Sequence, residues 1–146
     1  MREYKYDIEP FHIIKPQEIA KTHARIKPYI HRTPLLKSSL LNEWLGHKVI
    51  FKAENFQKIG AFKARGAINK ILKLKEQNQL PSRVVAFSAG NHSQAVAWAA
   101  KQFGIHATIF LPEIASPIKI QDTKSYGAEV IITKTRQEAE DRTEAL

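Results

Sequence analysis

The sequence has 146 residues, which is enough for one ordinary domain with a buried core. Its hydrophobic content of 43% is typical of a globular protein rather than a disordered chain. The absence of cysteine excludes disulfides, thiolate metal ligands and a cysteine nucleophile, and it fits a reducing, cytoplasmic location.

The formal net charge is +9, and the positive excess lies in the first hundred residues. Such a charge favours anionic partners. The basic residues are scattered and no nucleic-acid motif is present, so we expect no nucleic-acid partner. We expect no membrane segment either, because no apolar run approaches the roughly 20 residues that a spanning helix needs.

The first elements are predicted from local patterns. Residues 1–12 lack a clear period and predict an extended segment. Pro16 is typical of a helix start and Pro28 of its end. Further along the chain we expect an extended segment at 33–36, a helix at 40–45 that is capped by Ser38-Ser39 and ends at Gly46, and a strand at 48–54.

Lys63 follows this strand and the pattern-breaking Gly60. The apolar residues after it recur at helical spacing, at Ala64, Ala67, Ile68, Ile71, Leu72 and Leu74. Lys63 is therefore expected at a helix N-terminus, where a positive charge is disfavoured. A lysine in that place is easier to deprotonate, and a neutral amine can attack a carbonyl. An ordinary solvated lysine is the alternative.

Strands and helices alternate through the second half of the chain. The predicted strands are 83–87, 106–111 and 128–133, and the predicted helices are 92–103, 117–126 and one from about 136. This alternation indicates an α/β fold with parallel pairing and right-handed crossovers. In such sheets ligands bind at the carboxyl ends of strands, where Ser88-Ala89-Gly90-Asn91-His92 follows the first of these strands.

The two stretches FKAENFQKIGAFKARGA (51–67) and SAGNH (88–92), with HRTPL (31–35) and YGA (126–128), resemble the fold-type-II pyridoxal-phosphate enzymes. Within that family the sequence is similar to threonine/serine dehydratases and serine racemases. The resemblance implies parallel sheets flanked by helices, as in the tryptophan synthase β-like fold. It implies pyridoxal 5′-phosphate as the cofactor and threonine or serine as the substrate.

The resemblance also assigns roles to individual residues. Lys63 would hold the cofactor covalently and then take or relay the Cα proton of the substrate. Phe62 would pack beside the cofactor ring, with simple core packing as the alternative. Asn91 would hydrogen-bond the 3′-oxygen of the cofactor, with a helix N-cap as the alternative.

Ser88, Ala89, Gly90, Asn91 and His92 match the loop that binds the substrate carboxylate, largely through backbone N–H groups. His92 on its own could serve as a base, but a polar loop histidine is the preferred interpretation. Serine racemases usually carry a serine at the position of Ala89, which acts on the face opposite the lysine. Because alanine cannot move a proton, Ala89 favours a dehydratase over a racemase.

Relatives of this kind are more than twice as long as this sequence. We therefore expect residues 1–80 to be the first portion of the large domain and residues 81–146 to be a small α/β domain, incomplete at its end. The family's phosphate-binding loop and divalent-cation ligands would lie outside this sequence, so no metal site is expected within it.

Two classes of function remain open at this point. The chain is either a truncated or split enzyme with little activity alone, completed in trans by the remaining half, or a non-catalytic remnant of such an enzyme. Relatives are often oligomers, so a homo-oligomer also stays open.

Overall fold

The structure is a computed structural model that describes residues 14–146. The predicted extended segment at residues 1–12 lies outside the described residues. The helices form close to their predicted bounds. In chain order the elements are α1 (Pro16–Ile26), β1 (Leu35–Leu36), α2 (Ser39–Leu45), β2 (Phe51–Lys52), the 3₁₀ turns η1 (Glu54–Phe56) and η2 (Lys58–Gly60), α3 (Lys63–Glu76), β3 (Arg83–Phe87), α4 (Asn91–Lys101), β4 (His106–Pro112), α5 (Pro117–Ser125), β5 (Glu129–Thr133) and α6 (Arg136–Glu144).

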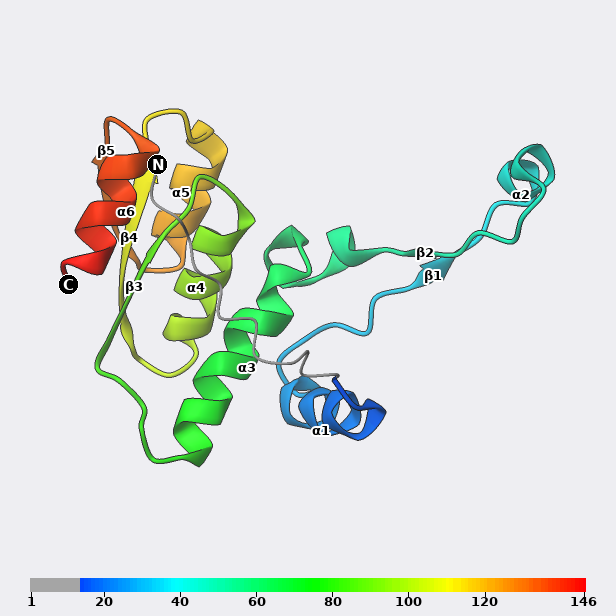
Figure 1. The fold of residues 1–146 in the computed structure, drawn as a ribbon, viewed down its shortest axis with the longest axis horizontal. Helices are drawn as coiled ribbons and strands as arrows, with labels where there is room; N and C mark the ends of the chain where they lie inside the picture. Colours follow the sequence, from blue (N-terminus) through cyan, green and yellow to red (C-terminus); the bar gives the residue numbers. More distant parts are fainter. Residues whose placement is uncertain (1–13) are drawn as a thin grey trace, which may run out of the picture.

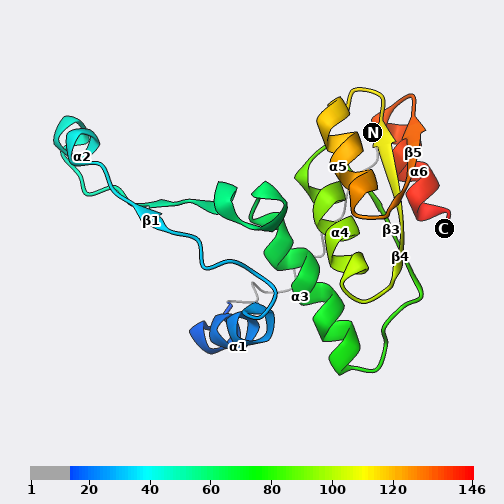
Figure 2. The same ribbon diagram turned by 180° about the vertical axis from the view of Figure 1, so that it is seen from behind.

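A three-stranded parallel sheet in the order β3-β4-β5 forms the centre of the fold, which confirms the predicted parallel pairing. In both ribbon views the sheet lies between α4 and α5 on one side and α6 on the other (Figures 1 and 2). Gly104 and Gly127 adopt positive φ where α4 and α5 end, which lets the chain turn back into the next strand.

The core lies between the sheet and helices α3 and α4. Ile109 and Leu111 of β4 are fully buried, and so is Ile68 of α3. The face of α4 that meets them consists mainly of alanine, which lets the neighbouring helices and strands approach closely. Helix α3 also contacts α1, so it joins the N-terminal helix to the sheet layer. The predicted domain division at residues 80/81 stays a prediction.

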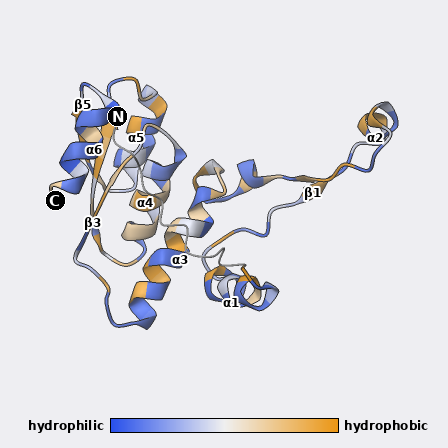
Figure 3. Ribbon diagram, in the orientation of Figure 1, coloured by the Kyte–Doolittle hydropathy of each residue, from blue (hydrophilic) through white to orange (hydrophobic). Residues whose placement is uncertain are grey.

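Residues 33–53 form an arm that extends away from the rest of the molecule (Figures 1 and 2). Its base is an antiparallel pair of two-residue strands, β1 and β2, and its tip is helix α2. Apolar residues colour much of the arm orange in Figure 3, although large side chains on it are exposed, as for Trp44 at 79% and Leu40 at 77%. The arm therefore lacks a core of its own.

The strand predicted at 48–54 is shorter in the structure, where β2 covers only Phe51–Lys52. Its one partner among the described residues is β1, which also has two residues. Pro34 directly precedes β1, and its carbonyl oxygen accepts a hydrogen bond from the Ala53 N–H. Because proline has no N–H to donate, the pairing of β1 with β2 ends there. The Val49 N–H donates instead to the side chain of Asn42.

The carboxylate of Glu54 ties the base of the arm to helix α3. It accepts two hydrogen bonds of 2.8 Å from Arg65 and one of 2.6 Å from the Thr33 hydroxyl. The Arg65 hydrogen bond is the main reason that the pKa of Glu54 is lowered to about 2 from its ordinary 4.5, and burial partly opposes it. The charged form of Glu54 is therefore the form that the fold holds.

This lowered pKa predicts acid-sensitive stability. Because Glu54 binds protons less readily when folded, its contribution is fully present above about pH 4.5 and is lost as the pH falls towards 2. Glu54→Gln should lower the free energy of unfolding at pH 7 by about 1–3 kcal/mol, and the deficit should shrink between pH 4.5 and 3. Urea unfolding at several pH values measures both, with the exposed Glu113→Gln as control. A deficit that does not change with pH would contradict the assignment.

Candidate active site around Lys63

Lys63 is the first residue of α3, as the sequence predicts. The chain reaches it through a tight turn in which Ile59 and Gly60 both have positive φ. Ala61 is buried under this turn, whereas the Lys63 residue is exposed. The turn thus anchors the backbone beside Ala61 and leaves the amine of Lys63 free to reach a ligand.

The 88–92 segment begins at the carboxyl end of β3. The Ser88 N–H continues the strand ladder by donating to Phe110 O at 3.1 Å. The Ser88 hydroxyl accepts a hydrogen bond from the Gly90 N–H at 3.1 Å. Gly90 is the N-cap residue of α4, so the helix begins at Asn91. The N–H groups of Asn91 and His92 lie in the first turn, where an α-helix provides no acceptor for them.

A cavity of about 490 Å³ lies where these two segments meet, and we call it the Lys63 cavity. Its lining residues come from α3, from the ends of β3 and β4, and from the starts of α4 and α6: they are Lys63, Phe87, Ser88, Ala89, His92, Pro112, Ile114 and Arg136. Four of the site residues that the sequence predicts therefore line the same cavity, although 25 positions separate Lys63 from Ser88. Phe62, Gly90 and Asn91 do not line it.

The surroundings of His92 lower the pKa of its imidazole ring. Although it counts among the exposed residues, partial burial of its ring lowers the pKa of His92, and the positive charge of Lys63 lowers it further. The predicted helix 92–103 begins at His92, and the structure agrees by placing His92 in the first turn of α4 rather than in a loop. Its neutral form is favoured, and a neutral imidazole can accept a proton.

Two alternatives from the sequence prove wrong. Phe62 is not a core residue, because it is 58% exposed, and its ring centroid lies 5.4 Å from the Lys63 Nζ. Asn91 is not the N-cap of α4, since Gly90 has that position. The Asn91 side-chain oxygen accepts a hydrogen bond of 2.5 Å from Lys119 of α5 instead. The proposed cofactor contacts of Phe62 and Asn91 stay predictions.

Arg136 is a cavity residue that the sequence reasoning missed. It is the first residue of α6, which follows β5, and its guanidinium carbon lies 6.0 Å from the ring centroid of Phe87. The rule that located Ser88 could have found it, because the carboxyl ends of β3 and β5 lie at the same edge of a parallel sheet. Arg136 adds to the Lys63 cavity a guanidinium that stays charged at any ordinary pH.

Residues 14–146 provide neither grouped metal ligands nor a membrane-spanning helix. In residues 14–146, no group of three or more His, Asp or Glu side chains is arranged to hold a metal ion. None of the helices in that range combines the length and the apolar composition needed to cross a membrane.

Comparison with known proteins identifies the family. A family model described as "Pyridoxal-phosphate dependent enzyme" matches residues 26–146. The chain therefore belongs to that family, and its parallel sheet flanked by helices is a portion of the fold-type-II α/β architecture.

Individual relatives give the range of similarity. The chain is 49% identical over 107 residues to the L-threo-3-hydroxyaspartate ammonia-lyase of Saccharomyces cerevisiae, covering 73% of this chain and 32% of that protein. It is 47% identical over 126 residues to the catabolic L-threonine dehydratase of Staphylococcus aureus, covering 86% and 36%. Maize serine racemase has a similar structure, with a TM-score of 0.78, 44% identity, and coverage of 85% and 37%. The chain spans about a third of the length of these curated relatives.

The nearness of Lys63 to His92 can be measured without any ligand. Lys63→Gln removes a positive charge, so the pKa of His92 should rise towards its ordinary value of 6.5 while burial still holds it below. A pH titration of the His92 ring by NMR measures the shift. Lys101→Gln, which removes a lysine at the far end of α4, should leave the His92 titration unchanged. An identical His92 pKa in all three proteins would contradict the position of the Lys63 amine beside the His92 ring.

Proposed function

We propose that this chain provides the lysine-bearing part of a pyridoxal-phosphate-dependent enzyme of the threonine/serine dehydratase type. The reaction removes the 3-hydroxyl group and the Cα proton of a hydroxy amino acid as water. Hydrolysis of the resulting enamine then gives a 2-oxo acid and ammonia. Threonine and serine are the proposed substrates.

The observation that carries this proposal is the common cavity of Lys63 with Ser88, Ala89 and His92. Family membership supports the cofactor, because the family is described by its dependence on pyridoxal phosphate. The names of the relatives support the reaction, since they include a threonine dehydratase and a hydroxyaspartate ammonia-lyase. The chain spans about a third of those proteins, so the activity of a whole enzyme is part of the proposal.

The residues of the Lys63 cavity fit an aldehyde cofactor at one end. An exposed primary amine at the cavity wall can condense with an aldehyde, and about 490 Å³ is within the usual size of a small-molecule site. When bound, the cofactor supplies a conjugated ring that accepts the electron pair left on Cα. Lys63 is the residue that would hold this ring covalently at rest, and once released its amine would take the Cα proton.

The cations and amides around the cavity suit the carboxylate of an amino acid. The first-turn N–H groups of α4 and the guanidinium of Arg136 are available donors for an anionic group. Neutral His92 lies on the same wall and can accept a proton within the site. These residues would fix the orientation of the substrate, so that its Cα proton faces Lys63.

Ala89 favours elimination over racemisation. Racemisation removes the Cα proton on one face and returns a proton on the other, so it needs a proton-transferring group on each face, and the methyl side chain of Ala89 cannot transfer a proton. Elimination needs proton removal from one face only, which Lys63 alone can perform. The proposal therefore prefers the dehydratase reaction, although maize serine racemase is among the similar structures.

Borohydride reduction tests the role of Lys63. With excess pyridoxal phosphate, reduction makes a lysine–cofactor bond permanent, and peptide mass mapping identifies the lysine. We expect Lys63 to be labelled several-fold more than the other lysines, because it adjoins a cavity in which the cofactor ring can be held. The label should disappear in Lys63→Ala and remain in Lys70→Ala, which removes an exposed lysine two turns along the same helix. Equal labelling of many lysines would favour the non-catalytic remnant.

A turnover assay tests whether the 146-residue chain is sufficient. We expect its production of 2-oxo acid from serine or threonine to equal that of Lys63→Ala, because the chain matches only about a third of its relatives. A loose, partial site binds the cofactor weakly and positions the substrate poorly. Production that depends on Lys63 would contradict this expectation and would show that the chain alone is a working enzyme.

A further inference from the structure

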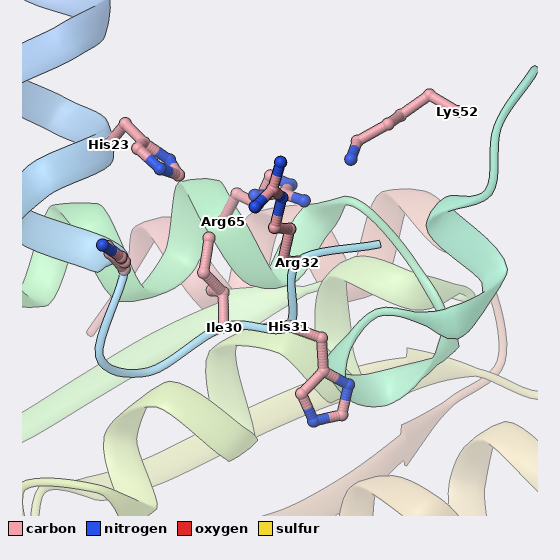
Figure 4. A pocket seen from close by; sticks show the side chains of 7 residues that line it. His23, Ile30, His31, Arg32, Lys52 and Arg65 are labelled. Atoms are coloured by element: carbon pink, nitrogen blue, oxygen red, sulfur yellow. The ribbon is translucent and has the colours of Figure 1, made fainter. Parts of the chain in front are cut away.

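A second cavity, of about 530 Å³, lies between α1 and the start of α3. We call it the basic cavity, because six of its seven lining residues carry basic side chains: His23, Lys27, Ile30, His31, Arg32, Lys52 and Arg65. In Figure 4 the side chains of His23, Arg32, Arg65 and Lys52 surround a common space, while the His31 ring turns away from it. The His31 Nδ1 lies 3.0 Å from Phe56 O, which accounts for its direction.

The positive charge of the basic cavity is only partly balanced. Arg65 is paired with Glu54, and the Lys52 ammonium donates to Thr33 O at 2.6 Å, which is a neutral acceptor. Within residues 14–146, neither Lys27 nor Arg32 forms an ion pair with an acidic side chain. Four lining residues are Lys or Arg, and among residues 14–146 the Glu54 carboxylate balances one of these charges, because it pairs with Arg65 and also attracts Lys52. Lys27 and Arg32, both in the loop after α1, therefore leave the cavity with an excess of positive charge.

The basic cavity is separate from the Lys63 cavity. Lys63 and Arg65 are two residues apart in α3, which places their side chains about 200° apart around the helix axis. The two cavities have no lining residue in common. A ligand in the basic cavity would therefore bind without occupying the place of an amino acid beside Lys63.

The charge and shape of the cavity identify a class of ligand. The excess cations repel one another, so an anion with several adjacent negative charges gains more there than a single carboxylate. A guanidinium binds phosphate oxygens through paired hydrogen bonds, and flexible lysines adapt to the remaining oxygens. We propose that the basic cavity is a binding site for a small molecule that carries a diphosphate group.

Pyrophosphate is the probe for this proposal, with the 146-residue chain titrated by calorimetry at low ionic strength. We expect saturable 1:1 binding that weakens as salt is added and raises the unfolding temperature. Lys27→Gln and Arg32→Gln, both at exposed positions, should each weaken binding about tenfold. Lys124→Gln on α5 removes the same charge far from the cavity and should leave the affinity unchanged.

The controls keep this proposal distinct from the proposed function. Lys63→Ala should still bind pyrophosphate with unchanged affinity, whatever the labelling experiment shows. Equal weakening in Lys124→Gln would mean that pyrophosphate responds only to the overall charge, and the site would be rejected. Absence of binding to the unaltered chain, or equally tight binding of inorganic phosphate, would also reject a diphosphate site.

Discussion

The ion pair between Glu54 and Arg65 is the contact on which the arrangement of this molecule depends. The Glu54 carboxylate accepts hydrogen bonds of 2.6 to 2.8 Å from the Thr33 hydroxyl, at the start of the arm, and from the Arg65 guanidinium of α3. Its own position is at the exit from the arm, in η1. Because Lys63 begins the same helix two residues before Arg65, this pair orients the N-terminus of α3 and the candidate catalytic lysine with it.

Helix α3 separates two cationic cavities with different chemistry. On one side the Lys63 side chain lies beside the first turn of α4, and on the other side Lys27, Arg32 and Lys52 line the basic cavity. The net charge of +9 is thus not spread evenly over a solvated surface. Part of it is concentrated where a small anion can contact several cations at once, which strengthens each contact.

The arm at residues 33–53 has few contacts that hold it in place. A pair of two-residue strands is marginal by itself in water, and the large apolar side chains of α2 and β1 remain exposed. By contrast, β4 is buried along nearly its whole length, because α6 packs on it and α4 covers it as well. Stability is therefore expected to be concentrated in the sheet layer and in α3 and to be lowest in the arm.

The sequence by itself determined the helices, the three parallel strands and the stretches that carry Lys63 and Ser88, because helical spacing, glycine and proline act locally. It did not determine the length of β2, which depends on how much partner strand the fold provides. Tertiary structure alone decided that Asn91 binds Lys119 and that Phe62 is exposed. It also decided that Arg136 lines the same cavity as Lys63. Arg32 and Arg65 line the other cavity. Those relations join residues distant in sequence, and only the packing of α1, α3, α5 and α6 brings them together.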